Sequence, residues 1–325
     1  MERRRALLGI AGFGVLGSIA SRAFAQSGKL PVIGTLDGGA RMSWWAAFRS
    51  QLHDLGYVEG KNFTLEQRFA RGNFDALPAL AEGLVKLPAD VIVTTSTAAA
   101  LATKHATDKI PIVMATGSDH VALGLAASLS KPGGNVTGLS TVATELTDKR
   151  FELLREMNPR LARLAVLWHR QNVGSAPAIR DLERAARRSK VALQNLGFSK
   201  SEEIPAAFAA AVKERIEAVF VVLAPLTYAE RKNICALALK HRLPTMHGSV
   251  EFVEAGGLAS YGANYADLHR RAAVYVDKIL QGAKPGDLPI EEPTKFDLAL
   301  NLGTAKAIGV LIPQAVLVRA SRVVD

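Results

Sequence analysis

Short apolar runs alternate with amphipathic helical patterns along most of the chain, and this alternation limits the possible folds more than any other feature. In the first third, each buried-strand pattern is followed by apolar residues three or four positions apart. The strand patterns cover 30–36, 62–69, 90–95 and 110–114. Such regular alternation predicts a parallel sheet with helices on both faces. The carboxyl ends of its strands would meet along one edge of the sheet.

The alternation resumes after residue 140 and predicts a second lobe of the same design. Its strand patterns cover 164–168, 191–196, 218–223 and 243–247, with a helical pattern between each pair. An amphipathic pattern at 265–279 has no strand of its own, so we expect this helix to return to the first lobe. Two short helices, at 304–309 and 313–324, are expected near the C-terminus.

The stretch 110–140 is expected to hold both a ligand-lining turn and a passage between the lobes. Small and polar residues at 115–120 follow a buried strand pattern. A helical spacing of apolar residues over 121–129 comes next, and a Lys-Pro-Gly-Gly stop ends it. A buried strand, a small-residue turn and a helix start form the unit with which open α/β sheets hold ligands. The extended pattern from Asn135 would then carry the chain into the second lobe.

The first 25 residues resemble a signal peptide and are excluded from the fold. Three arginines at 3–5 precede an apolar segment at 6–20, and Ala23-Phe24-Ala25 fits a cleavage site. A G-x-G-x-x-G match at 12–17 lies inside this segment with no strand before it, so it does not indicate a dinucleotide site. We expect export to the periplasm by the Sec or twin-arginine route. Without a cysteine near the cleavage site, no lipid anchor is expected.

Charge and motif content argue against several other classes of protein. The formal net charge is +10, but the basic residues are scattered and their densest cluster, at 180–188, is mixed with acids on one helical pattern. We therefore expect no nucleic-acid binding. The single cysteine, Cys235, allows no intramolecular disulfide. The sequence has no zincin, nucleophile-elbow or Walker motif, so neither an enzyme nor a metal or cofactor site is expected.

Candidate ligand-binding residues are those expected at strand ends, at helix starts and on the segments between the lobes. They are Asp37, Trp44, Thr95, Ser96, Thr97, Thr116, Asp119, His120, Trp168, Asn172, Pro225, Glu251 and Tyr261.

Several of these candidates have an alternative structural role. Ser96 and Thr97 stand where a helix begins and would suit an anion, or would simply cap the helix. Asp119 could pair with a ligand amine or cap the next helix, and His120 could be a helix-start residue. Trp168 could stack on a ligand or belong to the core.

Two aromatic candidates, Tyr261 and Trp44, also have an alternative. Tyr261 could contact ligand or brace the hinge. Trp45 has the spacing of a core residue, which makes its neighbour Trp44 the candidate for the cleft.

Seven long motifs in a fixed order resemble those of a known family. They are LPVIGTL (30–36), LGYVEGKNFTLEQRFARGNFDALPALA (55–81), IPIVMAT (110–116), VALGLAASLSKPGGNVTGLS (121–140), KRFELLREMNP (149–159), AGGLASYG (255–262) and KILQGAKPGDLPIEEPTKFDLALNLGTAKAIG (278–309). The chain resembles the bacterial ABC-transporter substrate-binding proteins sometimes called TrpX-like, which have the type I periplasmic-binding fold. It departs from that family at His120, where a proline is usual, and over 168–172.

The resemblance implies two Rossmann-like lobes with parallel sheets, joined by three crossover segments, with a ligand held between them. The first lobe would comprise 30–136 plus 263–293 and the second 139–258 plus 302–325. The hinge crossovers map to 135–140, 258–262 and 294–301.

The implied function is that of an extracytoplasmic receptor of an ABC importer. It would trap a small organic ligand, an amino acid or an aromatic or small carboxylate, by hinge closure. A membrane permease would be its partner, and the receptor itself is expected to be a monomer. The alternative is a soluble ligand-sensing partner of a receptor or regulator on the same fold.

Overall fold

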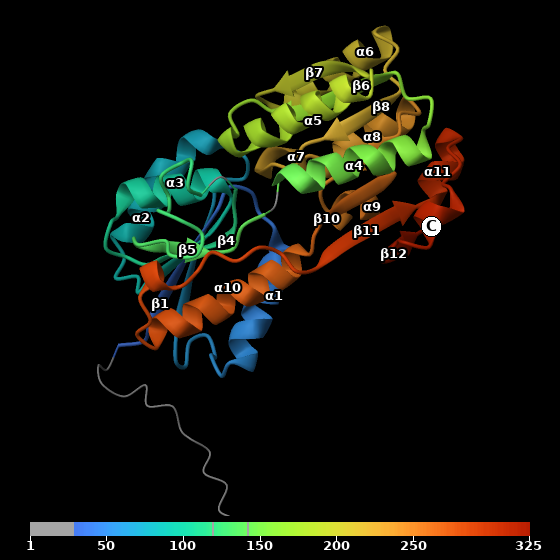
Figure 1. The fold of residues 1–325 in the computed structure, drawn as a ribbon. Coiled ribbons are helices and arrows are strands. Elements are labelled where there is room, and N and C mark those ends of the chain that lie inside the picture. The colour runs from blue at the N-terminus through green and yellow to red at the C-terminus, as the bar shows by residue number, and fades with distance from the viewer. Residues whose placement is uncertain (1–28, 119, 142) are drawn as a thin grey trace, which may run out of the picture.

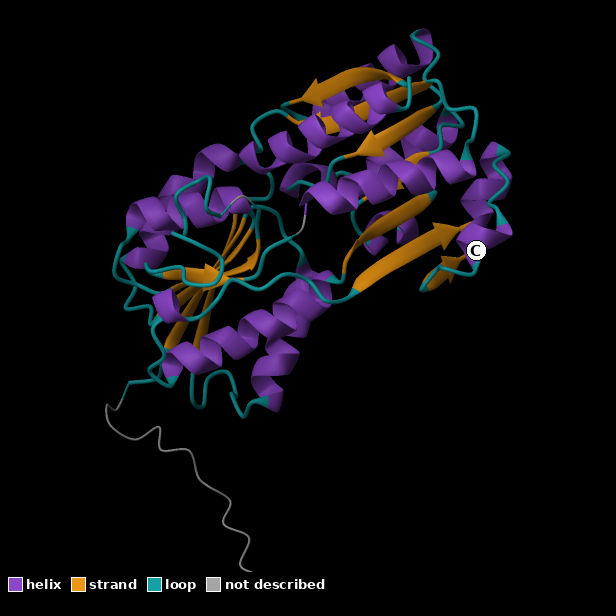
Figure 2. Cartoon of the chain, viewed as in Figure 1, coloured by secondary structure: helices purple, strands orange, loops and turns teal. Residues whose placement is uncertain are grey.

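The computed structural model describes residues 29–118, 120–141 and 143–325. The predicted signal segment and Asp119 lie outside these ranges. Two α/β lobes stand side by side. One contains the blue-to-teal part of the chain together with a long orange helix, and the other contains the green-to-yellow part together with the red C-terminal elements (Figure 1). Strands form the centre of each lobe and helices cover them (Figure 2).

The first lobe is built on a five-stranded parallel sheet with the order β2-β1-β3-β4-β5. Its elements are β1 (Val32–Asp37), α1 (Met42–Asp54), β2 (Thr64–Phe69), α2 (Leu77–Val85), β3 (Val91–Thr95), α3 (Thr97–Ala106), β4 (Ile112–Thr116), β5 (Val136–Gly138) and α10 (Tyr265–Leu280).

Helices cover both faces of this first sheet. The apolar face of α1, with Trp45 and Phe48 fully buried, packs with Ala272 and Val276 of α10. On the other face, α2 and α3 enclose a separate core around Leu36. The late helix α10 thus packs on the sheet formed by the first part of the chain, as its spacing without a strand led us to expect.

The second lobe contains a seven-stranded sheet with the order β12-β11-β10-β9-β8-β6-β7. Its elements are α4 (Ala143–Met157), β6 (Arg163–His169), α5 (Ala176–Arg188), β7 (Ala192–Phe198), α6 (Ile204–Lys213), β8 (Ala218–Val221), α7 (Pro225–Ala229), α8 (Arg231–Lys240), β9 (Thr245–His247), α9 (Val250–Glu254), β10 (Ala259–Ala263), β11 (Phe296–Asn301), α11 (Leu302–Ile308), α12 (Gln314–Leu317) and β12 (Arg322–Val324). The predicted α/β class with two lobes of parallel sheet is confirmed.

Two segments predicted as hinge crossovers lie within this second sheet. The ranges 258–262 and 294–301 correspond largely to β10 and β11, which pair antiparallel with Tyr261 opposite Leu298. Buried apolar residues such as Ala259 and Leu300 fix these strands in the core of the lobe. The chain therefore leaves the lobe just beyond β10, at Asn264, where α10 begins.

Two helices predicted from the sequence are absent or shorter in the structure. Residues 121–129 form turns, because Gly124 takes a positive φ of 70° and the Ala127 N–H donates to the Pro132 carbonyl. At the C-terminus, α12 ends at Leu317 and β12 follows instead of more helix. Pairing β12 with β11 provides partners for backbone groups at what would otherwise be a bare sheet edge.

Candidate functional site

Two adjoining cavities, of about 90 and 80 Å³, lie where the carboxyl ends of the two sheets face each other. The larger is lined by Arg41, Trp44, Ser96, Thr97, Thr116, Gly117, Ser118, Thr141, Asn172, Gly174, Leu223, Ala224, Pro225 and Tyr265. The smaller shares five of these residues and adds Leu146, Arg150, Ala178 and Val222. Both lobes contribute to the lining, so the two cavities form one interlobe cleft.

The start of α3 presents strained and polar backbone to this cleft. Ser96 has φ 110° and ψ 149°, a conformation that is almost restricted to glycine and is often found at functional sites. Its Oγ accepts the Ala99 N–H at 3.3 Å, so Ser96 caps the helix and lines the cleft as well. Thr97 Oγ1 accepts the Ser118 N–H at 3.1 Å and ties this helix start to the turn after β4.

The two charged side chains of the loop after β1, Asp37 and Arg41, pair with each other. Asp37 is fully buried and forms an ion pair with Arg41, while the Trp45 indole N–H donates to it at 3.0 Å. Its backbone neighbours Gly39 and Arg41 also donate to the same carboxylate. Asp37 therefore orients Arg41 at the edge of the cleft, and its oxygens already accept four groups of the protein.

Aromatic side chains from three elements meet at one wall of the cleft. Trp44 stacks on Tyr265 with ring centroids 4.4 Å apart, and Tyr228 lies 5.2 Å from Trp44. The Arg41 guanidinium lies over both the Trp44 and Tyr228 rings. Burial raises the pKa of the Tyr265 hydroxyl, which keeps it protonated. This wall offers a flat apolar surface with a cation at its rim.

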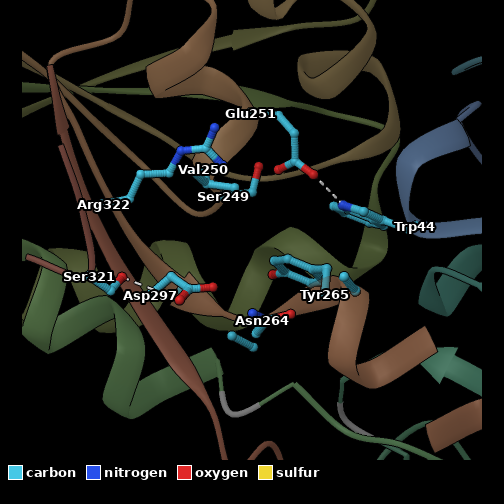
Figure 3. Close-up of a pocket in the computed structure, with 12 residues that line it drawn as sticks. Trp44, Ser249, Val250, Glu251, Asn264, Tyr265, Asp297, Ser321 and Arg322 are labelled. Carbon is cyan, nitrogen blue, oxygen red and sulfur yellow. Dashed lines mark hydrogen bonds between the residues drawn. The ribbon is translucent and has the colours of Figure 1, made fainter. Parts of the chain in front are cut away.

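A larger cavity of about 310 Å³ is also lined by Trp44 and Tyr265 and lies beside β10 and β11 (Figure 3). Glu251 of α9 projects into it, and the Trp44 indole N–H donates to Glu251 Oε1 across the lobes (Figure 3). The second oxygen, Oε2, is buried without a hydrogen-bond partner among the described residues. Glu251 thus connects the second lobe to the aromatic wall of the first.

Replacing Glu251 with alanine is expected to shift the unliganded protein about tenfold toward the open arrangement. A hydrogen bond to a charged group contributes about 1.5–3 kcal/mol, and this one spans the lobes. Small-angle X-ray scattering would show a larger radius of gyration. Glu254→Ala is the matched control, since Glu254 ends the same helix but pairs with Arg322 of its own lobe. Equal radii of gyration for the two variants would show that the Trp44–Glu251 hydrogen bond does not hold the lobes together.

Six of the predicted site residues lie outside the cleft lining, and two of them, Asp37 and Glu251, are described above. Thr95 is buried, with its Oγ1 3.1 Å from Nε2 of His269. His120 is buried and lines neither cavity. Tyr261 stacks on Phe296 of the neighbouring strand, and Trp168 donates its indole N–H to Asn195.

Strand parity explains the position of Trp168. Successive side chains of a strand point to opposite faces, so a shift of one residue exchanges core and solvent faces. His169, the next residue, points toward the first lobe and stacks on Phe74 with ring centroids 5.0 Å apart. The interlobe residue at the end of β6 is therefore His169.

Of the remaining predictions, Trp44, Ser96, Thr97, Thr116, Asn172 and Pro225 line the cleft directly. Sequence reasoning missed Arg41, Ser118, Thr141, Arg150 and Tyr265. The helical spacing over 265–279 predicts only an apolar face for Tyr265. Its position directly after the capping residue Asn264, where β10 ends, is the signal that it opens toward the cleft.

The lobes are in close contact in this structure. A methyl group at Gly174 would come within 3.2 Å of Thr97 Oγ1 on the opposite lobe, and one at Gly38 within 3.0 Å of Pro225. The cleft cavities are also smaller than the ~300–1,000 Å³ typical of small-molecule sites. A ligand of ordinary size therefore enters only when the lobes separate.

A family model described as ABC transporter substrate binding protein matches residues 29–324. The chain belongs to this family of ABC transporter substrate-binding proteins. A curated relative of this substrate-binding protein, the tyrosine-binding protein of Clostridioides difficile, is 28% identical over 261 residues, which is 80% of this chain and 75% of the relative. The resemblance predicted from the motifs is confirmed.

Two solved structures place this substrate-binding protein within the type I fold. The ABC domain of Streptococcus pneumoniae in complex with L-Trp has a TM-score of 0.84 at 23% identity, covering 91% of this chain and 100% of that one. A ligand-free, open substrate-binding protein with adhesive properties from Clostridium difficile has a TM-score of 0.66 at 26% identity, covering 91% and 99%.

Among the described residues of this substrate-binding protein, no helix is long and apolar enough to cross a membrane. Among the same residues, no group of three histidine, cysteine or acidic side chains is placed to hold a metal ion. The matched relatives are substrate-binding proteins, and the absence of catalysis stays a prediction for this chain.

Proposed function

We propose that this protein is an extracytoplasmic receptor of an ABC importer that closes around an aromatic amino acid or a related aromatic carboxylate. The observation that carries this proposal is the interlobe cleft, in which the stacked Trp44 and Tyr265 rings adjoin a polar helix start and two arginines. Stacked rings suit a flat apolar body, and the positive groups suit a carboxylate. The tyrosine-binding relative supports the same class of ligand.

Hinge closure would couple binding to transport. A ligand that contacts both lobes favours the closed arrangement by its differential affinity for that state. The closed receptor, a monomer exported by the segment 1–25, would then be recognised in the periplasm by a permease.

A thermal-shift screen of the mature protein would test the ligand class. L-Tyrosine, L-tryptophan or L-phenylalanine at about 100 times Kd is expected to raise Tm by about 5 °C or more, because binding at that level adds about 2.7 kcal/mol. Scattering should show a smaller radius of gyration with the same ligand. Stabilisation by sugars or cations alone would show that the proposed class is wrong.

Transport and sensing can be separated in the native host. Deleting the gene should abolish uptake of the radiolabelled ligand identified by the screen, and a plasmid copy should restore it. Unchanged uptake, together with ligand binding by the purified protein, would favour the sensing role instead.

A further inference from the structure

Arg150 is a buried cation at the inner end of the cleft. It projects from α4 with only 7% of its surface exposed and lines the smaller cavity with Ser118, Thr141 and Tyr265. Its Nε–H donates to the backbone carbonyl of Tyr261, which fixes the plane of the guanidinium.

Two glycines, Gly248 and Gly262, lie beside the terminal Nη2 nitrogen of Arg150. A methyl group added at Gly248 or Gly262 would lie 3.3 or 3.5 Å from Arg150 Nη2. The guanidinium is thus held in one orientation against small backbone segments of the second lobe, while Ser118, Thr141 and Tyr265 border the same cavity.

Two other charged groups at the cleft have partners within the protein. Arg41 pairs with Asp37, and one oxygen of Glu251 accepts the Trp44 indole N–H. For Arg150, no carboxylate of the described residues lies within ion-pairing distance, and its recorded acceptor is the Tyr261 carbonyl.

Burial without a counter-charge is costly for this group. Taking a cation out of water costs several kcal/mol unless a partner compensates it. Burial lowers the pKa of Arg150, in line with that cost. The nearby His247 offers no compensation, since burial and the Arg150 charge lower its pKa to about 3 and keep it neutral. Among the residues that the structure describes, none supplies a negative charge beside Arg150 in the closed cleft.

We propose that Arg150 anchors the carboxylate of the ligand, and that this ion pair is what makes closure favourable. The inference rests on the proposed function and names the group that recognises the acid. A planar guanidinium held by its Nε can still offer its terminal N–H groups to a carboxylate. An anion between the lobes supplies the missing charge, whereas closure on a neutral ligand leaves the cation buried and unpaired.

The lining of the same cavity restricts the rest of the ligand. Leu146, Ala178, Val222 and Leu223 present apolar surface around the guanidinium. A second carboxylate would lose its hydration against these walls without a partner. The ligand is therefore a monocarboxylate with an apolar body, and dicarboxylates such as succinate are excluded.

Calorimetric titration of the mature protein with L-tyrosine and L-tyrosinamide tests the anchor directly, because the two probes differ at the carboxylate. The wild type is expected to bind the acid about 100-fold more tightly than the amide. Arg150→Gln should weaken acid binding about 100-fold and leave amide binding within about threefold. Arg150→Lys, which keeps the charge, should restore part of the acid affinity. Arg155→Gln, an exposed position on the same helix, should change neither.

The outcomes separate the anchor from the proposed ligand class. If Arg150→Gln weakens acid and amide equally, Arg150 only shapes the cleft and the anchor is wrong. If neither tyrosine probe binds the wild type, the aromatic class fails, and L-leucine, benzoate and succinate are titrated next. Binding of a monocarboxylate that Arg150→Gln abolishes supports the anchor; binding of succinate or of neutral sugars alone overturns it.

Discussion

Lowering the pH from 7.5 to 5 is expected to destabilise the protein by several kcal/mol, with about 2 kcal/mol from each of three buried histidines. Burial lowers the pKa of His120 and of His269 to about 4, and that of His247 to about 3. In the unfolded chain each imidazole binds a proton near its ordinary pKa of 6.5. The unfolded state therefore binds more protons below pH 6.5, and stability falls as the pH drops from there toward 4.

Burial away from water is the main reason that the folded state resists protonation of His269. Its Nδ1–H donates to the Tyr265 carbonyl at 2.8 Å, which leaves Nε2 to accept the Thr95 hydroxyl proton at 3.1 Å. Protonation of Nε2 would require the Thr95 hydroxyl to rotate and to accept a proton instead of donating one. His247 is similarly restricted, because it lies against Phe252 and close to the charge of Arg150.

Urea unfolding at pH 7.5, 6 and 5 would measure this dependence. His247→Gln should make the fall in unfolding free energy between pH 7.5 and 5 smaller by about 2 kcal/mol, since it removes one buried imidazole. His53→Gln is the control, because the His53 side chain is 77% exposed and its substitution should leave that fall unchanged. An unfolding free energy that is the same at pH 7.5 and 5 would contradict the prediction.

Gly138→Ala is expected to reduce stability by 4 kcal/mol or more and to lower the soluble yield sharply. Gly138 ends β5 with φ 131°, which is unfavourable for any residue with a side chain. An added Cβ would lie 2.3 Å from the Met114 carbonyl oxygen and 2.5 Å from the Met114 nitrogen. Both contacts are with the backbone of the neighbouring strand, so relief requires β5 to move away from β4.

Gly134→Ala provides a control in the same connection, four residues earlier. A Cβ there meets nothing within 4 Å, and its effect is expected to stay within about 0.5 kcal/mol. The midpoints of chemical denaturation would compare the two variants with the wild type. Similar midpoints for both would show that β5 adjusts easily, against the expectation.

The strand patterns could be predicted because they are local properties of the sequence. Continuous apolar runs such as 91–95 are fully buried strands of a parallel sheet, as their composition indicated. The helical spacing over 121–129 was misleading, since Val121 is 48% exposed and the turn at Gly124 breaks the period. A pattern of three apolar residues is too short to overcome such backbone preferences.

The missed site residues depend on contacts between distant segments. Arg150 belongs to a helix rich in charges, and its burial follows from the Tyr261 carbonyl 111 positions later in the chain. The choice between Trp168 and His169 depends on which face of β6 meets the first lobe. Neither fact is present in a local pattern. The cleft position of Ser96 and Thr97 could be predicted, because a helix that starts directly after a strand of a parallel sheet starts at the edge where this fold binds ligands.

The hydrogen bond between Trp44 and Glu251 gives the molecule a built-in optical signal. Of the three tryptophans in the sequence, Trp44 has its indole paired with the opposite lobe, whereas Trp45 binds Asp37 and Trp168 binds Asn195 within their own lobes. Separation of the lobes would expose the Trp44 indole to water and leave the other two in place. Its fluorescence should shift to longer wavelength on opening, so the rate of domain motion can be followed in solution without an attached dye.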